Sequence, residues 1–118
     1  MSVIGEALDL LVDALDVALP DVPVTRDPQV VRAGLASAGV CVFVRPPTVA
    51  GRTAGGLQLD VPVSIVLPAT DSLADHERAY ALLDQLLHLT GQNQTTRPPV
   101  PLGADLNPAH TVTVRIGA

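Results

Sequence analysis

The chain has no lysine and no tryptophan, and it has only one phenylalanine, one tyrosine and one cysteine among 118 residues. So few aromatic rings leave it without the stacking platforms that single-stranded nucleic acid usually needs. Because a P-loop requires a lysine, the glycine-rich run at 51–56 cannot be one. The single cysteine, Cys41, excludes an internal disulfide, and its place in an apolar run is typical of a buried structural thiol.

The charge balance is acidic, with seven arginines against twelve aspartates and glutamates and a formal net charge of −5. No basic stripe is present, which argues against tight binding to a phosphate backbone. The first turns are acidic where a secretory signal would be basic, and no run reaches the roughly 18 apolar residues of a membrane span. We therefore expect a soluble protein that acts where it is made or assembled.

The length and the 47% hydrophobic content predict one domain over residues 1–118 with an aliphatic core. Helical and strand periodicities then predict its elements. In chain order these are a helix at 3–19, an edge strand at 22–25, strands at 40–44 and 57–67, a helix at 72–90 and a final strand at 111–116. Residues 26–39 stay ambiguous, with one helical turn at 28–32 as an option. The expected helix caps and stops are Ser2, Pro20, either Asp71 or Ser72, and Gly91.

The two central strands differ in the polarity of their faces. Residues 40–44 are apolar at every position, so both faces of this strand should be covered, in part by a neighbouring subunit. The run at 57–67 alternates between apolar and mainly polar positions, and Pro62 within it predicts a partly open edge or a bulge. The elements together predict an α+β fold: a small mixed sheet of about four or five strands with two main helices packed on one face.

Two long segments fall outside these elements, at 46–56 and 92–110, and we expect both to be flexible loops. The first has three interpretations: an anion-binding nest, a docking loop for another protein, or a plain solvent loop. The nest is disfavoured because the segment leads into a strand, whereas phosphate loops usually open a helix.

Acidic residues recur along the first helix at spacings of three and four, so they share one stripe on its surface. They are Glu6, Asp9, Asp13 and Asp16. One interpretation is a solvated helix face. The other is an interface that meets arginines of another subunit, because no basic residue within the helix neutralises the stripe. The candidate partners lie in or beside the two long segments and are Arg45, Arg52 and Arg97.

The residue pattern contains no recognisable catalytic or metal-binding motif. His76, His88 and His110 lack the spacing of metal ligands, and neither HExxH nor CxxC occurs. The histidines are expected at the surface or at a partner contact. A small enzyme or ligand-binding domain would need convergent polar groups in a pocket, and the sequence shows no such set. We therefore predict no enzymatic activity, no catalytic residues, no cofactor and no metal.

A family resemblance follows from the order of the elements. The strand VPVSIVL at 61–67 runs into the helical segment LADHERAYALLDQLL at 73–87. With the preceding helix, the short strands and the closing strand, this resembles the tail terminator, or tail completion, proteins of long-tailed bacteriophages (siphophages). It is most similar to those from phages of high-GC actinobacteria. The resemblance spans roughly residues 3–116 and rests on element order, size and composition.

The resemblance implies a structural virion protein that is assembled in the host cytoplasm and lies at the head-proximal end of the tail. Such proteins form a ring, commonly a hexamer, that stops polymerisation of the tail tube and offers a surface for head–tail joining. The implied partners are other copies of the chain, the major tail tube protein and a head–tail connector or stopper protein. DNA would pass through the ring without specific binding, and no membrane would be involved.

Two other functions stay open at this point. Another head–tail connector, a neck protein or a minor tail protein would share the size and the α+β character. A small dimeric bacterial adaptor domain would instead associate through an open sheet edge. The mass of the native assembly separates a ring from a dimer.

Overall fold

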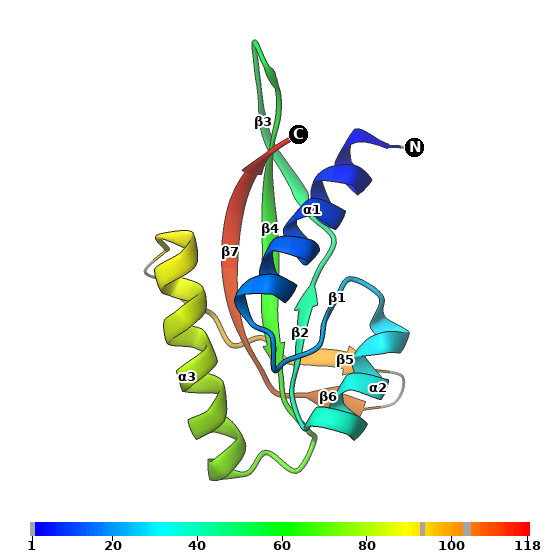
Figure 1. Ribbon diagram of the computed structural model, residues 1–118, viewed down its shortest axis with the longest axis vertical. Coiled ribbons are helices and arrows are strands. Elements are labelled where there is room, and N and C mark those ends of the chain that lie inside the picture. Colours follow the sequence, from blue (N-terminus) through cyan, green and yellow to red (C-terminus); the bar gives the residue numbers. More distant parts are fainter. Residues whose placement is uncertain (1, 93, 103–104) are drawn as a thin grey trace.

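The computed structural model describes residues 2–92, 94–102 and 105–118. This part of the chain forms three helices and seven strands (Figure 1). In chain order they are α1 (Val3–Ala18), β1 (Val24–Thr25), α2 (Pro28–Ala38), β2 (Cys41–Val44), β3 (Thr48–Thr53), β4 (Gly56–Val66), α3 (Leu73–Thr90), β5 (Val100–Leu102), β6 (Asp105–Asn107) and β7 (Ala109–Gly117). The predicted α+β fold with a small mixed sheet is confirmed.

The main sheet is built around β4, its longest strand. On one side of β4 lie β2 and then β3, both antiparallel to it, and β1 is added parallel to β2 at the edge. On the other side lies β7, antiparallel to β4 from Gln58 to Val66. The remaining strands, β5 and β6, form a separate two-stranded hairpin.

Pro62 sits where the partners of β4 change. Pairing with β2 stops at Val63, and pairing with β3 starts at Asp60. A proline has no backbone N–H to donate, so it belongs at a break in the ladder. Its carbonyl still accepts from the Arg45 N–H at 2.9 Å. The partly open edge that Pro62 predicted is therefore the gap between β2 and β3.

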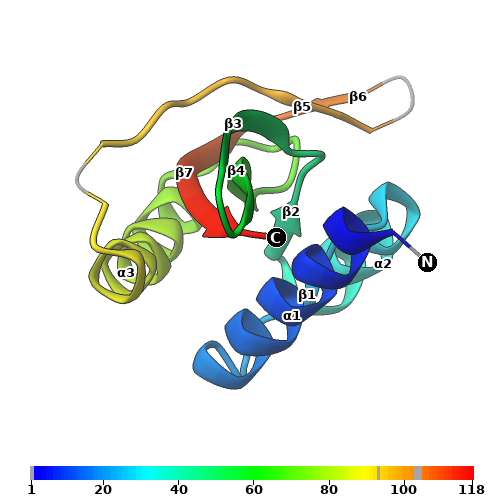
Figure 2. The same ribbon diagram turned by 90° about the horizontal axis from the view of Figure 1, so that it is seen from above.

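Two helices, α1 and α3, pack on the same face of the sheet, as expected (Figure 2). They contribute Leu8, Leu15, Ala79 and Leu86 to a continuous aliphatic core. From the sheet this core receives Val42 and Val44 of β2, Leu59, Val61, Val63 and Ile65 of β4, Val112 and Val114 of β7, and the flanking residues Val40 and Leu67. Fully burying one such aliphatic side chain stabilises the fold by about 1.5–3 kcal/mol, so this face holds most of the hydrophobic stabilisation.

The opposite face of β2 and β4 has a smaller core of its own. Cys41 and Phe43 pack there against Val31 of α2 and against Val100 and Leu102 of the β5–β6 hairpin. Both faces of β2 are thus covered, and the cover comes from the same chain. The expectation that a neighbouring subunit supplies part of it is wrong, because it overlooked α2 and the hairpin.

The helix caps follow the sequence signals. The Ser2 side chain accepts from the Gly5 N–H at 2.8 Å, and that of Ser72 accepts from the Asp75 N–H at 3.2 Å. Gly91 ends α3 in the left-handed conformation, with φ of 69°. Such side-chain caps satisfy backbone donors that a helix start leaves free.

Within the ambiguous stretch at 26–39, Pro28–Ala38 form the helix α2, which is longer than the single turn at 28–32 that the sequence suggested. The Asp27 side chain caps α2 by accepting from the Gln29 N–H at 3.0 Å, and Pro28 occupies the first turn. Val31 and Leu35, four residues apart, face the smaller core. Gly39, with φ of 75°, closes the helix.

The expected loop at 46–56 is mostly strand. Residues 48–53 form β3, and a tight turn at Ala54 and Gly55 leads directly into β4. This hairpin projects beyond the rest of the molecule, near the end of β7 (Figure 1). The loop prediction is therefore wrong for 48–53, because cross-strand pairing with β4 outweighs the low strand propensity of Gly51.

The expected loop at 92–110 is also structured over much of its length. It contains β5, β6 and the start of β7, and Thr96 pairs with Thr111 as an isolated bridge. Val100 and Leu102 alternate around Pro101 and are buried. Positions 93, 103 and 104 of this prediction lie outside the described residues. Among the described residues, no helix is long and apolar enough to cross a membrane.

Candidate subunit interface

The acidic stripe of the first helix is exposed on α1. Glu6, Asp9, Asp13 and Asp16 all lie at the surface. Asp9 accepts a hydrogen bond from Nε of Arg26 at 2.8 Å, which forms an ion pair between α1 and the turn before α2. The stripe is thus partly neutralised by a residue that sequence reasoning missed, because Arg26 lies outside the helix.

An apolar row runs along the same exposed side of α1. Val3, Leu10 and Val17 are 61%, 70% and 82% exposed. Their seven-residue spacing places them on one side of a helix, beside the acidic stripe. We call these three residues the α1 apolar row. The sequence analysis missed Leu10 and Val17, although the repeat at 3, 10 and 17 was the available signal.

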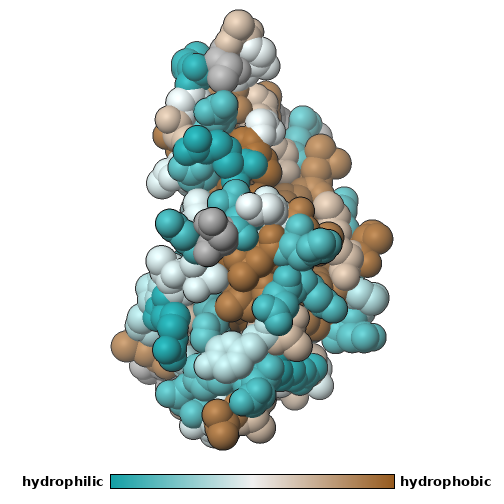
Figure 3. Space-filling model, turned by 90° about the vertical axis from the view of Figure 1, so that its left-hand side faces the viewer, coloured by the Kyte–Doolittle hydropathy of each residue, from teal (hydrophilic) through white to brown (hydrophobic). Residues whose placement is uncertain are grey.

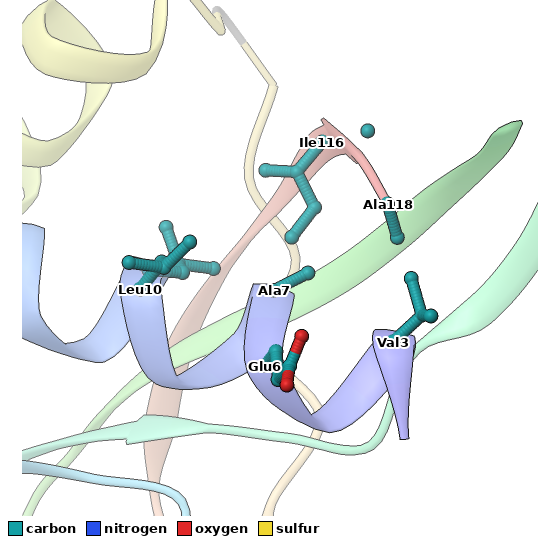
Figure 4. A pocket seen from close by; sticks show the side chains of 8 residues that line it. Val3, Glu6, Ala7, Leu10, Ile116 and Ala118 are labelled. Atoms are coloured by element: carbon teal, nitrogen blue, oxygen red, sulfur yellow. The ribbon is translucent and has the colours of Figure 1, made fainter. Parts of the chain in front are cut away.

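A pocket of about 410 Å³ lies between α1 and the end of β7. Its walls are mainly apolar, and Glu6 is its one ionisable side chain. Figure 4 shows Val3 and Ala7 of α1 opposite Ala118 and Ile116, with Leu10 at one end. Figure 3, which faces the α3 side, shows hydrophobic surface gathered between the middle of the molecule and its upper right. An open apolar pocket beside carboxylates is suited to a protein partner with apolar and basic side chains.

The structure does not bring the three candidate arginines together. Arg45 is half-buried just after β2, Arg52 is exposed on the projecting β3, and Arg97 lies near His110. In the described part of the chain, none of them forms an ion pair with the acidic stripe. Pairing of these arginines with the stripe of another subunit stays a prediction.

Two histidines and an aspartate form a hydrogen-bonded chain where α3 meets β7. His76 Nδ1 and His110 Nε2 are 2.9 Å apart, and His76 Nε2 bonds the carboxylate of Asp71. Tyr80 contacts the edge of the His110 ring, with ring centroids 5.4 Å apart. His110 is only 4% exposed, so its surface or partner-contact interpretation is wrong. Burial lowers the pKa of His110, as do the charges of Arg97 and His76, while Asp71 opposes them.

Cys41 behaves as the sequence predicted. It is fully buried, and burial raises the pKa of its thiol to about 11. A nucleophilic cysteine needs an accessible thiolate, so this residue is a packing residue.

The pockets offer little for chemistry. Five pockets are lined by described residues such as Glu6, Arg32 and Arg115, and each of these five has at most one ionisable side chain in its wall. Neither His76 nor His110 lines any of them. Within the described ranges, no group of three or more His, Cys, Asp or Glu residues could hold a metal ion.

No family model, no curated protein and no solved structure matches this chain. The features that stand out are the α1 apolar row, the acidic stripe beside it and the apolar pocket next to β7, and all three are suited to association with protein.

Proposed function

We propose that this chain is a structural subunit that forms a ring at the head-proximal end of the tail tube of a long-tailed phage. The ring ends tube polymerisation and presents the surface to which the head connector joins. The proposal joins the family resemblance of the sequence with the surface of α1.

The observation that carries it is the exposed α1 apolar row beside four carboxylates. An isolated exposed apolar residue is ordinary on a protein surface. Three exposed apolar residues on one side of a helix, beside a mainly apolar pocket, favour an association surface. Among the described residues Arg26 pairs with Asp9 alone, so the charges of Glu6, Asp13 and Asp16 stay available to a basic partner surface. Repeated head-to-tail contacts of this kind close into a ring when the rotation between copies allows it.

The charge of the molecule supports the proposed path of DNA. A net charge of −5 and the absence of lysine disfavour adhesion to phosphates, so DNA can pass through a ring without being held. Tight binding to duplex DNA at physiological salt would contradict this part of the proposal.

Electron microscopy of the purified protein, with and without phage tail tubes, tests the proposal. We expect rings, alone or at one end of each tube, and shorter tubes when the protein is present during polymerisation. Native mass spectrometry gives the number of copies, with a hexamer expected. Protein that neither forms rings nor binds tube ends would contradict the proposal, and a stable dimer would instead support an adaptor domain. Rings that bind connector without stopping the tube would support another neck protein.

A further inference from the structure

The outer edge of β7 is open over its last residues. The N–H and C=O groups of Ala118 bond those of Leu57, with both N···O distances at 2.9 Å. In an antiparallel pair such groups alternate in direction, so every second residue of β7, counted back from Ala118, points its N–H and C=O groups at β4. The residues between them point their N–H and C=O groups away from β4; these are Thr111, Thr113, Arg115 and Gly117. Thr96 takes up those of Thr111, at 2.8 and 2.9 Å. Beyond Thr111, no second strand borders this edge in the described part of the chain.

The outer edge of β3 is open in the same way. On β4, the N–H and C=O groups of Leu57 and Leu59 point at β7 and are not available to β3. The residues of β3 that lie opposite them, Arg52 and Val49, therefore point their own N–H and C=O groups away from β4. No strand among the described residues pairs with that side of β3. One molecule thus carries two unpaired edges, on opposite sides of the same sheet. Both strands are antiparallel to β4, so they run in the same direction.

The side chains of β3 suit the surface beside β7. Cross-strand partners share a face, so Val49 and Arg52 lie on the face that carries α1. Val49 is 56% exposed, and Arg52 is also exposed. On the same face, next to β7, lie the apolar pocket and Glu6. An added strand gains main-chain hydrogen bonds from the edge and selectivity from a neighbouring pocket.

We propose that β3 of one copy pairs with the open end of β7 of the next copy, with Val49 entering the pocket between α1 and β7. Arg52 then lies against the acidic face of α1, close to Glu6. The contact joins two different surfaces, so each copy offers a free β7 edge to one neighbour and a free β3 edge to the other. This inference rests on the proposed ring and names the contact that would hold it together.

Cross-linking between two single-site variants tests the pairing without disturbing the core. Val49→Cys protein is mixed with mass-tagged Leu10→Cys protein and treated with a short bismaleimide. The buried Cys41 does not compete. Leu89→Cys, exposed on α3, replaces Leu10→Cys in the matched control. We expect the Val49–Leu10 product in several-fold excess over the Val49–Leu89 product.

Charge exchange tests the same contact in solution. Arg52→Glu and Glu6→Arg should each shift the assembly towards monomer, and the double variant should restore it. Glu77→Arg, an exposed site on α3, is the control and should change nothing. Two results would overturn the strand pairing and leave the ring proposal standing. One is a ring in which Val49→Cys cross-links preferentially to Leu89→Cys, and the other is a ring whose size neither charge reversal changes. A wild-type chain that stays monomeric throughout, or a dimer closed by β7 against β7, would overturn the pairing as well.

Discussion

His76 and His110 are joined by a hydrogen bond of 2.9 Å between Nδ1 of the first and Nε2 of the second, across the contact of α3 with β7. Asp71 accepts from the other nitrogen of His76, so the chain of hydrogen bonds runs from the surface to a buried ring. Asp71 itself adopts φ of 53°, a conformation that aspartate tolerates better than most residues. A chain of this kind accommodates one added proton, but two imidazolium rings cannot share the His76–His110 bond.

The lowered pKa of His110 predicts a loss of stability in mild acid. The unfolded chain binds a proton near the ordinary value of 6.5, whereas folded His110 binds it only at lower pH. Between these two values the unfolded state holds more protons, so the free energy of unfolding falls as the pH falls through that window. Urea unfolding at a series of pH values from neutral to mildly acidic measures this slope.

The matched variants are His110→Gln and His88→Gln. The first removes the titrating group at the α3–β7 contact and should flatten the slope below pH 6.5, whatever its effect at neutral pH. The second changes an exposed histidine on α3, away from the contact with β7, and should leave the slope as it is. An unchanged slope in His110→Gln would show that another group carries the acid sensitivity.

Replacing Gly56 by alanine should disrupt the end of the β3–β4 hairpin. Gly56 adopts φ of 140°, and a Cβ there would overlap the carbonyl oxygen of Ala118. Strain of this kind costs about 1–3 kcal/mol before the overlap is counted. Thermal unfolding of Gly56→Ala beside Gly55→Ala tests this, since a Cβ at Gly55 meets nothing within 4 Å. Equal stability of the two variants would contradict the predicted strain.

Much of the fold was predictable because its signals are local. Ser2 and Ser72 cap helices through residues three positions on, and the uninterrupted apolar run at 40–44 indicated a strand covered on both faces. Pro62 marked a break in the ladder of β4. Each of these depends on spacing along a single helix or strand, which the sequence displays directly.

The features that escaped prediction depend on tertiary contacts. His76 and His110 are 34 residues apart, and the ion pair of Asp9 with Arg26 joins two elements. The strand β3 follows two prolines and contains a glycine, so only its pairing with β4 shows it to be a strand. The repeat at 3, 10 and 17 can be read from the sequence, but its exposure depends on the packing of Leu8 and Leu15 against the sheet.

Ser64 and Thr111 should show energetic coupling in a double-mutant cycle. Their hydroxyls are 2.8 Å apart between β4 and β7, and both residues are buried. Thr111→Val leaves the buried Ser64 hydroxyl without its hydrogen-bond partner, which lowers the free energy of unfolding by about 1–3 kcal/mol. Removing both hydroxyls is nearly neutral. Ser64→Ala with Thr111→Val should therefore cost less than the two single changes added together.

The control for this cycle is Thr113→Val, two residues along the same strand. Thr113 is exposed, and its substitution should change the free energy of unfolding by no more than about 0.5 kcal/mol. Denaturant unfolding of all four variants and the wild type measures the coupling. Strict additivity at positions 64 and 111 would mean that each hydroxyl finds another partner.

Cys41 should be resistant to thiol reagents in the native protein. Its pKa of about 11, against 9.0 for a free thiol, reduces the thiolate population about a hundredfold at neutral pH, and the side chain is fully buried. Because β2 is covered on both faces, the reagent reaches the Cys41 thiol only after the structure around β2 has unfolded. We expect the labelling rate with a maleimide to rise with urea in step with unfolding, while Leu89→Cys, exposed on α3 and outside the proposed contact, is labelled at once. Rapid native labelling of Cys41 would mean that α2 and the β5–β6 hairpin lift away from β2 without global unfolding.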